Sequence, residues 1–285
     1  MSGGASAEGG VGAYLRLYRV RDWLHFLPLP LAGWAADPTS HGLATLASGV
    51  VAWGFGLAYT CAINQAFDDR VDRASAKNPV GSSFQRRAAV RLALPPLALM
   101  FVTLALGAPS GLPAAFILAA SATLYSAPPR LKRFVFVGTL WNLIVALPGF
   151  FFAARPPVLE LPLRPLAGAF TVVLLASQLI HEAQDKDDDA RAGVRTVATV
   201  AGRRAALLGA LALVAVLPLV TYLLGSGLET RWLATALCVP FSGLWVAVLN
   251  LFGRTEDRRV LKLLRLGYRY TGLGLGALLF LATRL

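Results

Sequence analysis

The sequence predicts an all-α integral membrane protein, and three observations support this fold class. The chain of 285 residues is 56% hydrophobic and only 15% charged, whereas soluble domains carry about 25% charged residues. Its mean hydropathy is +0.61, and apolar runs of the length that crosses a bilayer recur along it. We expect one transmembrane domain over residues 1–285, in which residues 1–12 form a flexible tail.

The apolar runs predict about nine membrane-spanning helices, because each can cover much of the roughly 30 Å of hydrocarbon in a bilayer. The first and fourth runs are short, and Pro28 and Pro30 are expected to kink the first, since proline lacks a backbone N–H. Cys61 and Cys238 lie inside apolar runs, so no disulfide framework is expected. The runs cover residues 23–36, 43–66, 88–108, 112–127, 134–153, 165–182, 204–225, 231–252 and 266–284.

The basic residues support this count of spans. If the N-terminus is cytoplasmic, 23 of the 27 basic residues fall on its side, and the exceptions are Arg155, Arg164, Arg231 and Arg284. Such a bias is the positive-inside signature. It predicts a bacterial inner (plasma) membrane protein whose N-terminus and active-site loops are cytoplasmic. The net charge of +12 is explained by contact with anionic membrane lipid, so no nucleic-acid partner is expected.

A first group of carboxylates follows the second apolar run, within residues 64–72. If the helix continues through this segment, Asp68 and Asp72 share a face and Asn64 lies one turn deeper. Anionic groups this close repel one another unless a cation lies between them. Mg²⁺ takes one or two carboxylates and completes its shell with water and phosphate oxygens. The alternative is a solvated helix end with scattered acids.

A second group of carboxylates ends the sixth run, on the same predicted side of the membrane. Asp185 and Asp189 are four residues apart, and Glu182 lies one turn earlier on the same side of a helix. The two groups together hold eight of the fifteen acidic residues, and this concentration indicates that the acids have a function. His181 is expected to be a hydrogen-bonded histidine at the boundary of the cavity and not a metal ligand.

Two carboxylate groups facing each other across a helical cavity fit the ionisation of an allylic diphosphate. Each can hold Mg²⁺ against the diphosphate, so that charge building up on the leaving group is stabilised as the carbon–oxygen bond breaks. Asp68, Asp69 and Asp72 also have the DDxxD spacing of soluble isoprenoid diphosphate enzymes.

Three motifs resemble the UbiA superfamily of intramembrane prenyltransferases. The family's first motif, Asn-x-x-x-Asp-x-x-x-Asp, matches Asn64, Asp68 and Asp72. Its second, Asp-x-x-Asp-x-x-x-Asp-x-x-x-Gly-x-x-Thr, matches Glu182, Asp185, Asp189, Gly193 and Thr196, with Glu in place of the first Asp. Its Tyr-Ser-x-Pro-Pro loop is matched by Tyr125-Ser126-Ala127-Pro128-Pro129-Arg130-Leu131-Lys132-Arg133. The resemblance covers nearly the whole chain and implies nine transmembrane helices around a central cavity, the UbiA-like prenyltransferase fold.

The resemblance also implies roles for the matched residues. The implied metal ligands are Asp68, Asp72, Asp185 and Asp189, with Asn64 and Glu182 assisting. The implied diphosphate-binding residues are Lys77, Arg130, Lys132 and Asn64. Tyr125 would line the cavity near the reacting carbon. We expect the neighbouring acids Asp69, Asp187 and Asp188 to be solvated.

The activity implied is Mg²⁺-dependent transfer of a prenyl group from an allylic (poly)prenyl diphosphate to a hydrophobic or aromatic acceptor, which includes membrane lipids. One departure leaves the acceptor open. Many family members continue with Arg-Pro-x-x-x-Gly after the first motif, whereas this chain has Lys77-Asn78-Pro79-Val80-Gly81. Lys77 supplies a point charge and not the two-pronged guanidinium.

Three other functions were compared with this one. A terpene cyclase on the same scaffold would use the same ionisation step, with the allylic cation attacking its own chain. A cation-coupled transporter usually places acids near the bilayer midplane, whereas both groups here lie at helix ends. A CDP-alcohol phosphotransferase has an Asp-Gly and Ala-Arg pattern that both groups lack.

Overall fold

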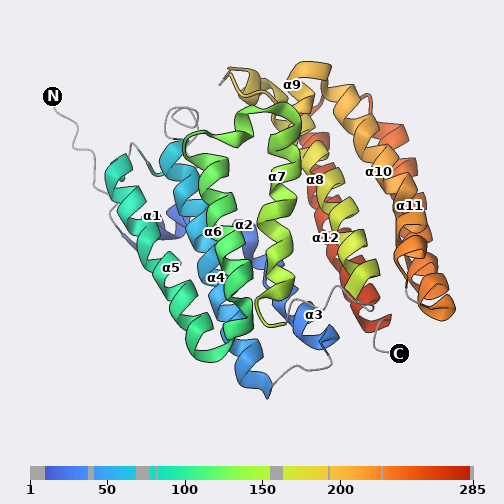
Figure 1. The fold of residues 1–285 in the computed structure, drawn as a ribbon. Coiled ribbons are helices and arrows are strands. Elements are labelled where there is room, and N and C mark those ends of the chain that lie inside the picture. Colours follow the sequence, from blue (N-terminus) through green and yellow to red (C-terminus); the bar gives the residue numbers. More distant parts are fainter. Residues whose placement is uncertain are drawn as a thin grey trace. The chain divides into compact units, whose positions relative to one another are not determined.

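The computed structural model describes residues 10–37, 42–68, 78–80, 83–154, 163–191, 193–225 and 227–282. These residues form helices joined by turns and include no β-strand, which confirms the predicted all-α fold (Figure 1). The chain divides into two compact units. Unit 1 comprises Met1–Trp34, Thr39–Leu131 and Pro148–Ala154, and unit 2 comprises Ala35–Pro38, Lys132–Leu147 and Arg155–Leu285.

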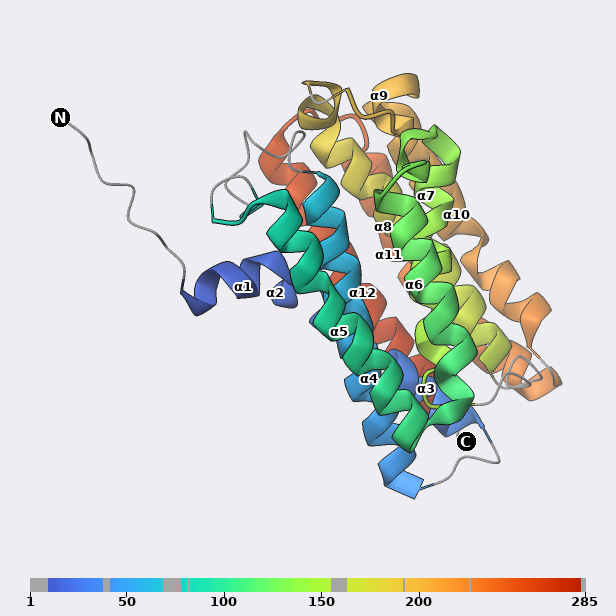
Figure 2. The same cartoon turned by 60° about the vertical axis from the view of Figure 1, so that its left-hand side comes forward.

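Unit 1 is built around a long central helix, α4, which packs against both α5 and α6. The short helices α1 and α2 lie across the direction of α4 and α5 (Figure 2). The helices of this unit, which includes most of α3, are α1 (Val11–Leu17), α2 (Val20–Trp23), α3 (Leu29–Ala36), α4 (Gly42–Phe67), α5 (Arg86–Gly107) and α6 (Leu112–Ser126).

The first predicted span is broken where its prolines begin. Residues 24–26 form a short 3₁₀ turn, and α3 starts only after Pro28, whose carbonyl accepts the Ala32 N–H at 3.0 Å. A proline has no backbone N–H to donate, so the helical hydrogen bonds are interrupted where Pro28 and Pro30 enter the chain. The predicted kink is therefore confirmed.

The core of unit 1 centres on Trp53 of α4, which is fully buried. Its indole N–H donates to the Phe26 carbonyl at 2.9 Å, and its ring meets Phe152 edge-on with 5.0 Å between centroids. At Gly56, one turn along α4, a Cβ would lie 2.5 Å from Cδ2 of Leu118. Residues 148–154 follow α7 in the chain and complete this core.

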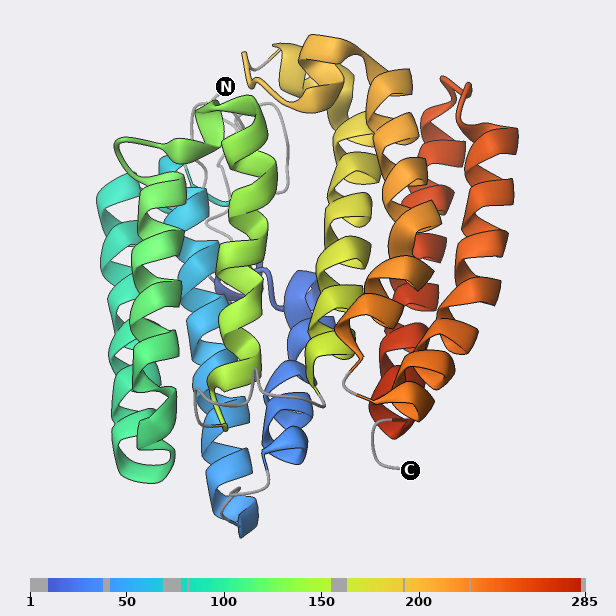
Figure 3. The same cartoon turned by 45° about the vertical axis from the view of Figure 1, so that its right-hand side comes forward.

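Unit 2 is a bundle in which α10 packs against α8 and α11, and α12 packs against the same two helices (Figure 3). Tyr268 is buried between Trp245 and Phe241, with ring centroids 4.9 and 5.7 Å away. The helices of this unit are α7 (Val135–Ala146), α8 (Leu163–Arg191), α9 (Val197–Ala201), α10 (Arg203–Leu224), α11 (Leu228–Phe252) and α12 (Arg258–Ala282).

Five helices among the described residues are long and apolar enough to cross a membrane, namely α4, α5, α8, α10 and α11. A shorter apolar stretch covers Val135–Phe151. These helices support an integral membrane protein. The count of nine spans, the orientation and the bacterial membrane stay predictions.

Candidate active site

In unit 1, the first carboxylate group begins at the end of α4. The helix ends at Phe67, and the N–H of Asp68 still donates to the Asn64 carbonyl at 3.0 Å. The side chains of Asn64 and Asp68 are therefore one helical turn apart, as predicted. Asp69, Asp72 and Lys77 lie outside the described residues.

The end of α6 provides partners for both of these side chains. The Ser126 hydroxyl donates to Oδ1 of Asn64 at 3.1 Å, and Nη2 of Arg130 donates to Oδ1 of Asp68 at 3.1 Å. The side chains of Asp68 and Arg130 are only 14% and 19% exposed. Water screens such a pair less than it screens a surface ion pair, so Arg130 is held firmly beside the predicted metal ligand.

Arg130 has two unusual features. Its backbone is left-handed, with φ of 59°, a conformation that costs a non-glycine residue about 1–3 kcal/mol. Its Nε is buried and has no hydrogen-bond partner among the described residues. A buried donor left unpaired costs about 1–3 kcal/mol. Strain and an unpaired donor together are typical of a group kept ready for a ligand, and a guanidinium suits phosphate oxygens.

Two other predicted residues are placed nearby in the chain. Tyr125 is half-buried in the last turn of α6, in unit 1. Lys132 lies in the short turn Leu131–Arg133 and belongs to unit 2. Unit 1 therefore brings together Asn64, Asp68 and Arg130.

Sequence reasoning missed two buried amide side chains near the first group. Gln65 holds the end of α1, and Asn78 holds the segment that returns after the group. Gln65 is buried and donates to the carbonyls of Arg16 and Leu17 at 2.7 and 2.6 Å. Asn78 donates to the Gln65 carbonyl at 3.1 Å and accepts the Val80 N–H at 2.9 Å. The departure from the family pattern thus contains a structural anchor. One signal in the sequence points to this anchor, which is that Gln65 precedes and Asn78 follows the acidic segment 68–72.

In unit 2, the second carboxylate group is helical throughout, because α8 continues to Arg191. Glu182 is buried, and its carboxylate accepts three hydrogen bonds. Oε1 accepts from Oγ1 of Thr139 at 2.8 Å and from Nε2 of Gln178 at 3.2 Å. Oε2 accepts the N–H of Val197 at 2.9 Å. Glu182 therefore ties α7 and the first turn of α9 to α8.

Asp185 and Asp189 keep the four-residue helical spacing that the sequence predicts. Oδ2 of Asp185 lies 3.1 Å from Nδ1 of His181. This contact agrees with the prediction that His181 is a hydrogen-bonded residue.

The other two acids of this group form ion pairs, and the expectation that they are solvated neighbours is incomplete. Asp187 accepts from Nη2 of Arg203 at 2.9 Å, and Asp188 pairs with both Arg191 and Arg258. They attach the end of α8 to the beginnings of α10 and α12. Helical spacing turns Asp187 away from Asp185 and Asp189. Asp188 lies one turn from Asp185, and its ion pairs arise because Arg191 and Arg258 are close to it.

Gly193 and Thr196, the last two matched positions, have structural explanations. Gly193 has φ of +67°, which favours glycine. Its N–H donates to the Ala190 carbonyl, and the Val194 N–H donates to the Asp189 carbonyl at 2.8 Å, the bonds of a Schellman motif. Thr196 caps α9 by accepting the Thr199 N–H at 3.2 Å. Gly193 therefore ends α8, and Thr196 begins α9 three residues later.

The oxygen donors of the two units suit a hard cation. The described residues contain no group of three or more His, Cys, Asp or Glu side chains that could hold a metal ion. Mg²⁺ takes one or two carboxylates and adds water and phosphate oxygens. Asp68 with Asn64 in unit 1, and Asp185 with Asp189 in unit 2, therefore fit Mg²⁺.

Glu182→Gln should lower the midpoint of thermal unfolding of the detergent-solubilised protein by several degrees. A glutamine has only one acceptor oxygen, so its amide nitrogen must face either the Nε2 amide group of Gln178 or the N–H of Val197, at a cost of about 1–3 kcal/mol. Glu229→Gln is the matched control, because Glu229 is exposed in the first turn of α11. Equal midpoints for the two variants would contradict the assigned role of Glu182.

The chain was compared with known proteins. The model of the UbiA prenyltransferase family matches residues 26–269. No curated protein matches the sequence.

Solved structures of low sequence identity share the fold. A UbiA homologue from Archaeoglobus fulgidus bound to GPP and Mg²⁺ is 22% identical, with a TM-score of 0.72 over 94% of this chain and 99% of that one. A digeranylgeranylglyceryl phosphate synthase is 18% identical, with a TM-score of 0.70 over 96% and 99%. An apo homologue from Aeropyrum pernix K1 is 20% identical, with a TM-score of 0.69 over 91% and 98%.

Proposed function

Because this chain belongs to the UbiA prenyltransferase family, we propose that it transfers a prenyl group from an allylic (poly)prenyl diphosphate to an aromatic or lipid acceptor within the membrane. The match over residues 26–269 is the observation that carries this proposal. The Archaeoglobus fulgidus homologue was solved with GPP and with DMAPP, each with Mg²⁺. These complexes support an allylic diphosphate as donor and Mg²⁺ as cofactor.

In the proposed reaction, the bond between the allylic carbon and the diphosphate oxygen breaks, and the oxygen keeps the electron pair. A nucleophilic atom of the acceptor then bonds to the allylic carbon, and the acceptor loses a proton. Arg130, Lys132 and Lys77 donate hydrogen bonds to the diphosphate oxygens. The Nε of Arg130 is buried and has no partner among the described residues, which supports this role, because a phosphate oxygen would satisfy it.

The carboxylates position the metal. In the proposed reaction Asp68, Asp72, Asp185 and Asp189 would hold Mg²⁺, with Asn64 and Glu182 assisting. When bound, Mg²⁺ neutralises the charge that develops on the diphosphate as it leaves. The ion pair at 3.1 Å keeps Arg130 beside Asp68, which supports the proposal that both residues act on the same diphosphate.

Tyr125 is proposed to line the cavity near the reacting carbon. The face of a tyrosine ring carries negative charge density that attracts a cation. Its place in the last turn of α6, five residues before Arg130, supports a position close to the leaving group.

The direct test uses membranes that contain the full chain and labelled allylic diphosphates of several lengths, with a total lipid extract as acceptor. We expect release of diphosphate in the presence of Mg²⁺ and none in EDTA. A prenylated acceptor among the products would support transfer, and a cyclic hydrocarbon without acceptor would indicate a terpene cyclase. No turnover with any donor would contradict the proposal, and cation flux in proteoliposomes would then test transport.

A further inference from the structure

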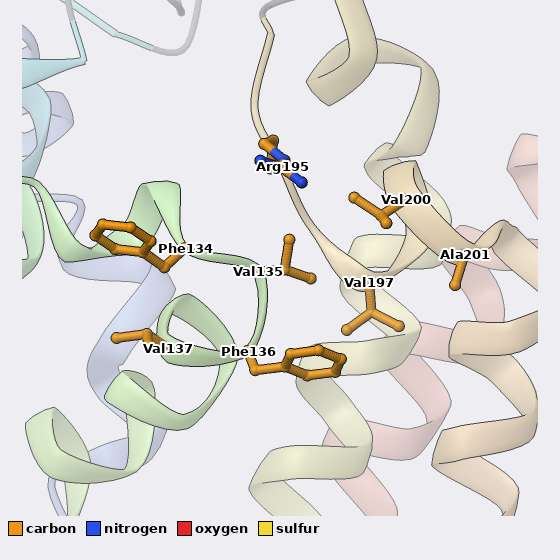
Figure 4. A pocket seen from close by; sticks show the side chains of 8 residues that line it. All are labelled: Phe134, Val135, Phe136, Val137, Arg195, Val197, Val200 and Ala201. Carbon is orange, nitrogen blue, oxygen red and sulfur yellow. The ribbon is translucent and has the colours of Figure 1, made fainter.

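A cavity of about 380 Å³ lies in unit 2, between the beginning of α7 and the connection from α8 to α9. Figure 4 shows Phe134, Val135 and Phe136 on one side and Arg195, Val197 and Val200 on the other. Arg195 is the only charged side chain among the described residues that line it. The proposed reaction uses none of these residues.

Arg195 is exposed and makes no hydrogen bond or ion pair with any other residue that the structure describes. It follows the charged end of α8 by four residues. The N–H of Val197, two residues later, donates to Glu182, where α8 changes from apolar to polar side chains. A guanidinium at such a boundary, above an apolar cavity, is suited to a ligand with an anionic head and an apolar body. Its fork of donors matches two phosphate oxygens.

The apolar surface continues from the cavity along one face of α7. Phe136, Leu140 and Ile144 are spaced by four residues, so they line one side of the helix, and they are 72%, 52% and 39% exposed. From Phe136 to Ile144 the helix rises about 12 Å. One leaflet contributes about 15 Å of hydrocarbon, so this face is long enough to accompany most of an acyl chain.

We propose that this cavity binds the phosphodiester head of an anionic phospholipid, whose hydrocarbon lies along the Phe136–Leu140–Ile144 face of α7. The head bridges α7 and the α8–α9 connection, which the Glu182 hydrogen bonds already hold together. A bound lipid therefore stabilises unit 2.

The charge of the cavity favours a phospholipid over an allylic diphosphate. A diphosphate carries several negative charges and needs metal ions or several cations around it. The lining residues that the structure describes include one arginine and no carboxylate to hold a metal. A phosphodiester has a single negative charge, which one guanidinium can balance.

Native mass spectrometry of the delipidated full-length protein tests the proposal, with phosphatidylglycerol as probe and EDTA present throughout. We expect Arg195→Gln to bind phosphatidylglycerol about tenfold more weakly than wild type, because it loses one charge-assisted interaction. Arg195→Lys should bind phosphatidylglycerol with an affinity between those of wild type and Arg195→Gln. Leu140→Ser should also weaken binding. Arg204→Gln is the matched control, since Arg204 is exposed at the beginning of α10 and does not line the cavity.

Three results would overturn the proposal. One is equal affinity of wild type and Arg195→Gln for phosphatidylglycerol, and another is an equal loss in Arg204→Gln. The third is Arg195-dependent binding of geranyl diphosphate or of inorganic phosphate that is tighter than binding of phosphatidylglycerol. Thermal unfolding of each variant without added lipid reports whether it is folded.

Discussion

Asp68→Asn and Asp185→Asn should each lower the Mg²⁺-dependent release of diphosphate by about 100- to 1,000-fold. Asparagine keeps the shape of the side chain and an oxygen that accepts from Arg130 or contacts His181, so the local structure is retained. It removes the negative charge that attracts the metal. The measurement is the initial rate with labelled allylic diphosphate at saturating Mg²⁺, with each variant normalised to its folded fraction.

Asp187→Asn is the matched control for these two variants. It removes one negative charge from the helix that carries Asp185, two residues further on, but Asp187 is 68% exposed and pairs with Arg203. An exposed pair is worth about 0–1 kcal/mol, so its rate should stay close to wild type. Rates near wild type for Asp68→Asn and Asp185→Asn, or an equal loss in Asp187→Asn, would show that the carboxylates act otherwise than proposed.

Gly33→Ala should be the most destabilising conservative change in unit 1. A Cβ at Gly33 of α3 would lie 1.6 Å from the carbonyl oxygen of Phe150. Backbone atoms on both sides must move apart, and forcing a methyl group into packed structure costs about 1–3 kcal/mol, with the upper end expected here. The measurement is the midpoint of thermal unfolding in detergent, which should fall by several degrees.

Gly54→Ala gives the control for this substitution. A Cβ at Gly54 of α4 would make only an ordinary contact, 3.7 Å from Cδ2 of Leu27. Because alanine is favoured over glycine in helices by about 0.5–1 kcal/mol, this variant should unfold at the same or a slightly higher temperature. A midpoint for Gly33→Ala as high as that of Gly54→Ala would contradict the packing assigned to α3.

Helix positions could be predicted closely wherever an apolar run ends in polar residues on both sides. The runs 43–66, 204–225 and 231–252 agree with α4 (Gly42–Phe67), α10 (Arg203–Leu224) and α11 (Leu228–Phe252). The run 165–182 predicts only the apolar part of α8. Hydropathy detects the segment that suits lipid, and it does not detect the polar turns by which α8 continues to Arg191. The break in the first run followed from proline chemistry.

The sequence could predict which residues are candidates for the site, but it could not predict which of them contact one another. Helical spacing correctly places Asp185 and Asp189 one turn apart. The ion pair of Arg130 with Asp68 joins positions 62 residues apart, and no local pattern encodes it. Glu182 reaches Thr139 across 43 residues, so its hydrogen bonds depend on how α7 and α8 pack. Long-range polar contacts of this kind require the tertiary structure.

The segment Pro148–Ala154 determines when unit 1 can complete its folding during synthesis. Domains generally fold as units as the chain leaves the ribosome. Trp53 and Gly56 of α4 are synthesised early, yet they pack against Phe152, which follows α7 in the chain. The core of unit 1 therefore stays incomplete after α6 has been synthesised and inserted. It can be completed only after α7, a helix of unit 2, has also been synthesised.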